Sequence, residues 1–398
     1  MTQLHLAAAL DGAGWHPAAW REPTARPEEL FQAGYWADLV AAAERGLLDF
    51  VTFEDGLGLQ SSRFDSLDGR TDQVRGRLDA VLVAARIAPL TNHIGLVPTA
   101  TTTHTEPFHL STALATLDYV SQGRAGWRPQ LSARPNEAAH FGRRELPAFS
   151  WENRDDPQVV RKLIELFDEA ADVVEVVRRL WDSWEDDAVI RDAATGRFID
   201  RDKLHYIDFV GEHFSVKGPS IVPRPPQGQL PVTTLAHQAV VYEFAARGAD
   251  LVYITPHDLD QARSIVEQVR TAERAVGRGG EPLRVYADIV VYVDDEPGEA
   301  AVRKVRLDAL DASGGSDAFV FTGTPDRLAE LLLSWQTAGI EGFRLRPGAL
   351  PHDLDAIVNG LVPSLQARGA FRTSYTEVTL RERLGLPLVA NRYAAQGT

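Results

Sequence analysis

The chain has 398 residues, enough for two average domains or for one large α/β barrel with insertions. Its formal charge is −15, from 41 basic and 56 acidic residues without a long basic run, which argues against nucleic acid or an anionic membrane as a partner. It contains no cysteine, so disulfides, thiolate nucleophiles and cysteine-ligated metals are excluded. Its first residues lack the features of a signal peptide and no apolar run approaches about 20 residues, so we expect a cytoplasmic protein.

Short β-rich runs alternate with segments of helical period, a pattern typical of a parallel sheet wrapped in helices. Strands are predicted at 4–10, 49–55, 94–100, 125–132, 230–236, 251–256, 283–293 and 342–347. The helices that follow them are predicted at 31–47, 78–90, 107–122, 161–184, 238–247 and 259–276, from 297 onward, and at 353–368. Eight βα units predict the α/β class and a (βα)8 TIM barrel in a single domain, residues 1–398. A doubly wound sheet is the alternative, but no strand is followed by a G-x-G-x-x-G turn.

Two stretches are longer than ordinary βα loops and rich in proline, glycine and charge. They are insertions at about 133–160, after the fourth strand, and at about 185–229, before the fifth. The second contains two alternating runs about Gly211-Glu212, which predict a β-hairpin. Insertions of this kind on a barrel are more often lids or interface elements than independent domains.

In the third unit, polar residues gather directly after the strand, at the end where barrel enzymes carry their chemistry. They are Thr99, Thr101, Thr102, Thr103, His104 and His109. Thr105 is in position to cap the helix that follows. One interpretation is turn chemistry and local backbone hydrogen bonding. The other is a rim of hydroxyls and imidazole that binds a polar cofactor ring, and the residues alone leave both open.

Two other loops at the same end of the sheet carry candidate residues. Asp55 ends the second strand, where it either orients a ligand or caps the next element, while Glu54 should point to the opposite face. His16 follows the first strand between Trp15 and Trp20. These aromatic residues either wall a pocket for a flat or apolar ligand, or plug the barrel mouth beside a solvated histidine.

The fifth helix begins at His237 and Gln238, where free backbone N–H groups could hold an anion such as phosphate. The alternative for His237 is a capping or solvent-facing histidine. No metal site is expected, because the histidines of the HTEPFH run at 104–109 straddle a loop-to-helix junction and no H-E-x-x-H pair exists. The sequence also lacks a G-x-S-x-G nucleophile elbow and a Walker A loop.

Several segments in order along the chain carry a resemblance to a known family. They are WHPAAWREP (15–23), GLVPTATTTHTEPFHLSTALATLDYVSQGRAGW (95–127), VRRLWDSWEDDA (177–188), FSVKGPSIVPRPPQG (214–228) and TLRERLGLPLVANRY (379–393). Together they resemble the bacterial-luciferase-like flavin-dependent monooxygenases, in the branch that acts on nitrilotriacetate, long-chain alkanes and dibenzothiophene sulfone. The resemblance covers essentially the whole chain, and as a combination it is specific.

The resemblance implies a barrel that is a homodimer or tetramer and that receives reduced FMN from a separate flavin reductase. With O2, such enzymes oxygenate a small organic substrate, and the protein excludes water and positions the substrate. Asp55, Thr99 and Thr101 match positions that contact flavin in the family. His109 matches the histidine at a helix start and His16 lies in the loop on the substrate side, so both are catalytic candidates.

The family pattern is altered where the flavin phosphate binds. The family's G-W-N ends in Arg128 here, and its histidine and tyrosine on the fourth helix fall at Leu163 and Phe167. Its Q-A-G-x-S before the fifth helix becomes 234–238, ending in His237 and Gln238. Four interpretations follow: Arg128, His237 and Gln238 replace the phosphate site, flavin binds weakly, the cofactor is instead the deazaflavin F420, or the barrel has lost catalysis and serves as a binding protein.

Overall fold

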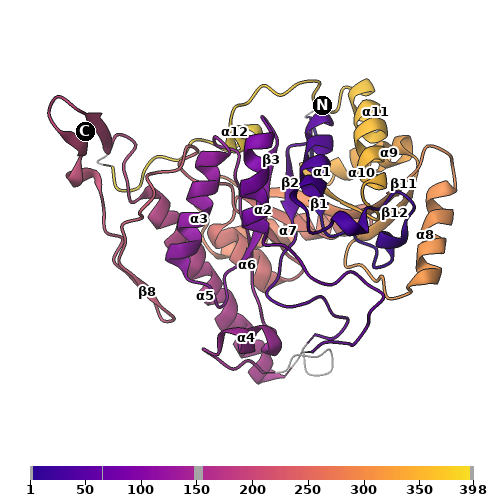
Figure 1. Ribbon diagram of the computed structural model, residues 1–398, viewed down its shortest axis with the longest axis horizontal. Coiled ribbons are helices and arrows are strands. Elements are labelled where there is room, and N and C mark those ends of the chain that lie inside the picture. The colour runs from indigo at the N-terminus through magenta and orange to yellow at the C-terminus, as the bar shows by residue number, and fades with distance from the viewer. Residues whose placement is uncertain (1–2, 65, 148–155, 395–398) are drawn as a thin grey trace.

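A computed structural model describes residues 3–64, 66–147 and 156–394. Its main sheet contains nine parallel strands, of which eight follow one another in the order β4-β3-β2-β1-β13-β11-β10-β9. A single bridge between Trp127 and Val232 sets β4 beside β9, so the sheet curls into a nearly closed barrel (Figure 1). The strands are β1 (His5–Leu10), β2 (Phe50–Phe53), β3 (Gly95–Thr101), β4 (Arg128–Gln130), β9 (Thr233–Leu235), β10 (Leu251–Ile254), β11 (Arg284–Val293) and β13 (Gly342–Pro347). The predicted (βα)8 barrel is confirmed.

Helices surround this barrel. They are α1 (Ala33–Arg45), α2 (Ala80–Ile87), α3 (Pro107–Val120), α5 (Pro157–Asp182), α6 (Ala239–Gly248), α7 (Leu259–Ala275) and α8 (Glu299–Leu310), and the last unit ends in α10 (His352–Ala356) and α11 (Val362–Ala367). Each turns an apolar stripe toward the strands, where residues such as Leu39, Leu114 and Val177 are buried. Glu106, not Thr105, precedes α3, and the Thr105 hydroxyl donates to the carbonyl of Thr101, so the predicted cap was wrong. Among the described residues, no helix is long and apolar enough to cross a membrane.

The sequence analysis missed one βα unit, β12 (Phe319–Gly323) with α9 (Pro325–Gln336). β11 is ten residues long. Its first half pairs with β10 and its second half, Ile289–Val293, pairs with β12. β12 therefore pairs with the part of β11 that extends beyond β10, and it is not one of the eight strands that form the barrel.

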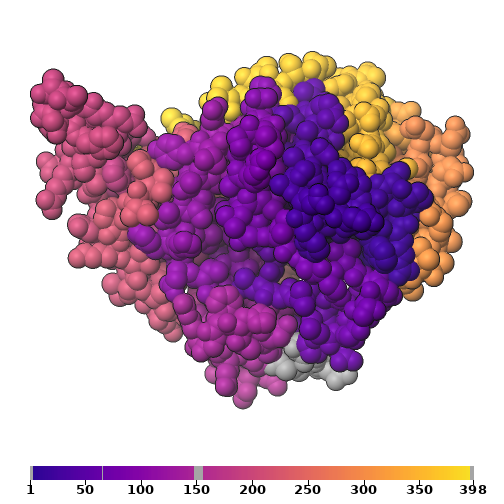
Figure 2. All heavy atoms as spheres, in the orientation of Figure 1, coloured from indigo at the N-terminus to yellow at the C-terminus, as the bar shows by residue number. Residues whose placement is uncertain are grey.

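The two insertions contain structure of their own. The first holds α4 (Pro135–Phe141), and its residues 148–155 lie outside the described part of the chain. The second forms two antiparallel hairpins, β5 (Val189–Asp192) with β6 (Arg197–Ile199) and β7 (Phe209–Val210) with β8 (Ser215–Val216). The hairpin expected about Gly211-Glu212 is thereby confirmed. This segment protrudes from the barrel body beyond α3 and α5 (Figures 1 and 2). The assignment of 1–398 to a single domain stays a prediction.

Candidate active site

Charged side chains fill the upper interior of the barrel. Alternate residues of a strand face the same side, so the inward positions of β13 are Arg344 and Arg346, opposite Asp288 of β11 and Glu54 after β2. Arg344 donates to both oxygens of Asp288, through Nε at 2.8 Å and Nη2 at 2.5 Å. Arg346 donates to Asp288 through Nε at 2.8 Å and to Asp317 through Nη1 at 2.6 Å.

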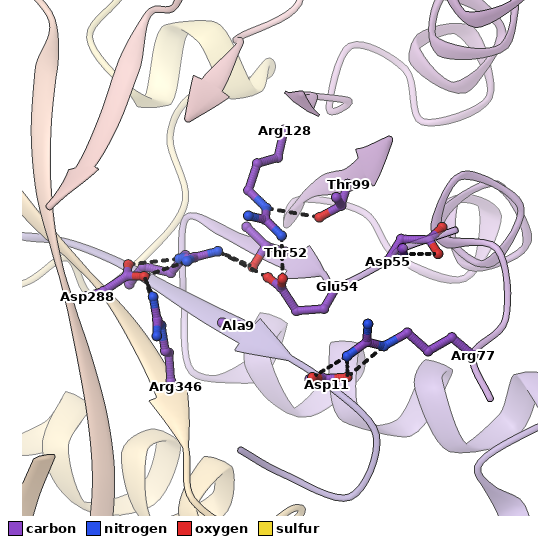
Figure 3. Close-up of polar contacts among 12 residues, drawn as sticks. Ala9, Asp11, Thr52, Glu54, Asp55, Arg77, Thr99, Arg128, Asp288 and Arg346 are labelled. Atoms are coloured by element: carbon purple, nitrogen blue, oxygen red, sulfur yellow. Dashed lines mark hydrogen bonds and ion pairs between the residues drawn. The ribbon is translucent and has the colours of Figure 1, made fainter. Parts of the chain in front are cut away.

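Glu54 connects this group to the opposite wall. It accepts from Arg344 Nη1 at 3.2 Å and is ion-paired with Nη2 of Arg128, whose Nε donates to Thr99 Oγ1 at 2.9 Å (Figure 3). We call these six charged residues the barrel ion network: Glu54, Arg128, Asp288, Asp317, Arg344 and Arg346. With three arginines and three carboxylates, the network is balanced in charge.

The network is stable because each buried charge has a partner. Burial alone would raise the pKa of Asp288, but the charges of Arg344 and Arg346 hold that pKa below its ordinary value. Burial likewise raises the pKa of Glu54, and Arg128 and Arg344 outweigh it and lower that pKa. Removing one member of such a buried pair costs about 3–5 kcal/mol, because the other charge is left without compensation.

A cavity of about 370 Å³ lies beside the network, between the C-terminal ends of β4 and β9 and helices α5 and α6. We call it the β4–β9 cavity. Its lining residues are Thr102, Arg128, Pro129, Gln130, Leu131, Phe167, Ala170, Thr234, Leu235, His237, Gln238, Val241 and Phe244. Three residues predicted to bind cofactor, Arg128, His237 and Gln238, thus come together in one cavity, and Phe167, which stands where the family has tyrosine, forms part of its wall.

The polar residues of this cavity differ in burial and partners. Arg128 is 6% exposed, and burial lowers its pKa. His237 is exposed at the rim, with Nδ1 2.9 Å from Thr255 Oγ1 and Nε2 3.3 Å from Asp317. The surrounding protein still lowers the pKa of His237 by desolvation, which favours the neutral imidazole at pH 7.

Asp55, Thr99 and Thr101 have other contacts. The carboxylate of Asp55 accepts from the backbone N–H of Gly56 at 2.7 Å and of Ala80, the first residue of α2, at 2.9 Å, while the N-cap of that helix is Asp79. Glu54 points to the opposite face, into the barrel, as expected (Figure 3). Thr99 is fully buried against Arg128, and Thr101 is 6% exposed. None of these three residues lines the β4–β9 cavity, and none lines a second cavity, beside His16, that is described next.

His16 is buried rather than solvated. Its Nδ1 accepts from the Ala18 N–H at 3.0 Å, so Nε2 carries the proton and donates to Asp308 at 3.1 Å. Burial lowers the pKa of His16. Together with Trp15 and Trp20 it lines a second cavity of about 270 Å³, which we call the first-loop cavity. Trp15 also lies under the Arg346 guanidinium, 4.5 Å from ring centroid to Cζ, so it contacts the barrel ion network too.

The two histidines of the third unit lie apart from this centre. His109 is exposed in the first turn of α3, and neither of the two cavities includes it in its lining. His104 is instead the buried one, 5% exposed with φ 71° and stacked on Phe141. Within the described residues neither ring nitrogen of His104 has a hydrogen-bond partner.

Sequence reasoning missed Asp288, Arg344 and Arg346. The signals were present: GFRLRP sets arginines at alternate positions of a strand, and RVYADIVVYV sets one aspartate inside an apolar strand. Inward-facing charges of opposite sign on neighbouring strands predict a buried ion pair. No group of three or more histidine, aspartate or glutamate side chains arranged to hold a metal occurs in the part of the chain that the structure describes.

Known proteins resemble this chain over most of its length. Residues 13–312 match the family described as luciferase-like monooxygenases. The chain is 30% identical to N-acetyl-S-(2-succino)cysteine monooxygenase of Bacillus subtilis (strain 168), and the alignment covers 98% of each. It is 31% identical to nitrilotriacetate monooxygenase component A of Aminobacter aminovorans, again over 98% of each.

A solved structure shares the fold. The crystal structure of the long-chain alkane monooxygenase LadA superposes with a TM-score of 0.85 at 24% identity, over 97% of this chain and 96% of that one. The fold is that of the parallel-barrel enzymes, which carry their chemistry at the carboxyl ends of the strands. The chain belongs to the luciferase-like monooxygenase family.

Proposed function

We propose that the protein is a flavin-dependent monooxygenase that takes reduced FMN from a separate reductase and, with O2, oxygenates a small organic substrate. Membership in the family supports this, and one relative is named as component A, that is, as one part of a larger system. The observation that carries the proposal is the β4–β9 cavity, which joins a buried arginine to an apolar wall at the carboxyl ends of the barrel strands.

FMN combines a flat ring with a charged phosphate, and the residues of this cavity match both parts. Phe167 and Phe244 provide apolar surface for the ring. Arg128, His237 and Gln238 provide donors for oxygen atoms of the cofactor. When bound, reduced FMN would supply the electrons that activate O2. The chain itself would bind and orient the cofactor and exclude water.

The two catalytic candidates, His16 and His109, have different surroundings. His16 is suited to hold a proton on Nε2 beside the first-loop cavity, because its tautomer is set by the Ala18 N–H. His109 could act only if substrate or a second subunit reaches the exposed start of α3. A homodimer or tetramer in the cytoplasm is part of the same proposal, and the strongly exposed Val210 and Ile221 of the protruding segment are candidates for its interface.

A binding protein without catalysis is the second candidate, because the positions that reach the flavin phosphate in the family are altered here, with Leu163 and Phe167 on the fourth helix. F420 in place of FMN is a further alternative on the same fold. All three are separated by titrating the protein anaerobically with reduced FMN and with reduced F420 and then admitting O2. Saturable binding of reduced FMN, and a rate of its reaction with O2 that differs from the rate of free reduced FMN, support the monooxygenase. Preference for F420, or no binding of either, refutes it.

A further inference from the structure

The loop that joins β2 to α2 borders the first-loop cavity and has little backbone support. Its residues 66–76, which we call the strap, contain no helix or strand, and among the described residues they make no backbone-to-backbone hydrogen bond. Gln73, Val74 and Arg75 of the strap line the first-loop cavity together with Ser313. Hydrogen bonds that involve side chains, rather than a backbone ladder, therefore hold one wall of this cavity in place.

One buried carboxylate accounts for most of the hydrogen bonds between the strap and the barrel body. Asp311, directly after α8, accepts from Arg70 through Nη1 at 3.2 Å and Nη2 at 2.9 Å, and from Gln73 Nε2 at 2.7 Å. Its side chain is only 2% exposed. The hydroxyl of Ser313 accepts from Arg70 at 3.1 Å and from Gln73 at 3.0 Å. Asp311 thus joins two loops that border the same cavity, although Gln73 lies 238 positions away in the chain.

The strap has internal contacts that keep its shape. Asp68 accepts from Nη2 of Arg75 at 2.7 Å. Gln60 closes the loop on Gly76, accepting from its N–H at 2.9 Å and donating to its carbonyl at 3.2 Å. A compact loop of this kind, with its ends tied together and few hydrogen bonds to the body, has low local stability and opens without unfolding the sheet beneath it.

We propose that the strap opens and closes the first-loop cavity, and that Asp311 is the latch that holds it closed. In the open form, the hydrogen bonds to Asp311 and Ser313 are broken and the cavity is accessible to solutes. The carbonyl of Asp72 accepts from Trp20 Nε1 at 3.1 Å and Arg21 Nη2 at 3.0 Å, and this contact is the point about which the strap turns. The proposal goes beyond the proposed function, because it concerns access to a cavity and requires no cofactor.

The test uses a single introduced thiol, because the chain contains no cysteine. Ala13→Cys places the thiol in the cavity lining, at a residue 3% exposed, and its reaction with N-ethylmaleimide is followed by mass spectrometry of the full chain. In this background Asp311→Asn should raise the rate about tenfold or more, because Arg70 loses its charged partner in the barrel body. The matched control is Asp72→Asn. Asp72 binds the same guanidinium, at 2.9 Å and 2.7 Å, but lies on the strap itself, so the rate should change less than about twofold.

A second variant and a second measurement keep the test independent of the folding of Asp311→Asn. Arg70→Gln removes the same contact from the side of the strap and should raise the rate to a similar extent. Hydrogen exchange should show lost protection in peptides from the strap and from 311–315, and none in those from β1 and β13.

An unchanged rate in both Asp311→Asn and Arg70→Gln overturns the proposal, and so does an equal acceleration by Asp72→Asn. Loss of protection throughout the barrel also overturns it, because the thiol would then react through global unfolding. These measurements need no flavin, so their outcome and that of the flavin titration are independent.

Discussion

Asp288→Asn is the most informative single change to this barrel, because Asp288 is fully buried and accepts hydrogen bonds from both Arg344 and Arg346. Asparagine keeps the shape but removes the charge and turns an amide N–H₂ toward a guanidinium. The expected loss is about 3–5 kcal/mol in the free energy of unfolding. At about 2.1 cal/mol/K per residue, the unfolding entropy of 398 residues is about 0.8 kcal/mol/K, so Tm should fall by about 4–6 °C.

The assay is differential scanning calorimetry at pH 7, with Asp260→Asn as the control. Asp260 also pairs with an arginine, Arg263 at 2.9 Å, but its side chain is 93% exposed, so its loss should stay below about 0.5 kcal/mol. The folded pKa of Asp288 is below the unfolded value of 3.8, so its stabilisation is complete above that value and is lost as the pH falls through the folded pKa. A Tm decrease no larger than that of Asp260→Asn would refute the network's role in stability.

Three further outcomes follow from other contacts. Gly14→Ala should lower the free energy of unfolding by more than about 1 kcal/mol, because the φ of Gly14 is +129° and a Cβ would lie 2.5 Å from the Gly348 carbonyl oxygen. Gly34→Ala in α1 has open space around the new Cβ and should raise the free energy of unfolding by about 0.5–1 kcal/mol. Urea denaturation measures both changes. The folded pKa of His16 is below 6.5, so the unfolded state binds its proton first and wild-type stability should fall as the pH drops below 6.5. His16→Asn should flatten that slope in urea titrations from pH 8 to 5, and an unchanged slope would contradict it. Val210→Glu, at a side chain 83% exposed on the hairpin, should lower the molar mass in light scattering if that segment joins subunits; an oligomer of unchanged mass excludes Val210 from the interface.

The strand positions could be predicted because alternation and βα order are local properties of the sequence. The missed unit, β12 with α9, shows the limit: FVFTG is short, and it becomes a strand because β11 extends beyond β10 and offers it an edge. Its formation depends on a long-range contact that periodicity does not contain. The same holds for His109, whose resemblance to a family position says nothing about the direction of its side chain on α3.

The candidate site also contains features that could be predicted from the sequence and features that could not. Arg128, His237 and Gln238 could be placed together, because carboxyl ends of parallel strands meet at one end of a barrel. The partners of Arg128 could not, because Glu54 lies 74 positions away in the chain and only barrel closure brings them together. The sequence leaves two roles open for Asp55, contact with a ligand and binding of the N–H groups at a helix start. Choosing between them requires knowing where the next helix begins.

The bridge between Trp127 and Val232 has a consequence for motion. β4 and β9 are three residues each, and they meet through two hydrogen bonds of Trp127, with the Pro231 carbonyl and the Thr233 N–H, whereas β11 and β13 share six paired positions. We call this junction between β4 and β9, which few hydrogen bonds hold, the seam of the barrel. It borders the β4–β9 cavity. In hydrogen exchange, amides along the seam should lose protection before those of β11 and β13. The junction held by the fewest paired positions and the most extensively paired strands therefore lie at different places in the barrel wall, and the β4–β9 cavity borders the first of them.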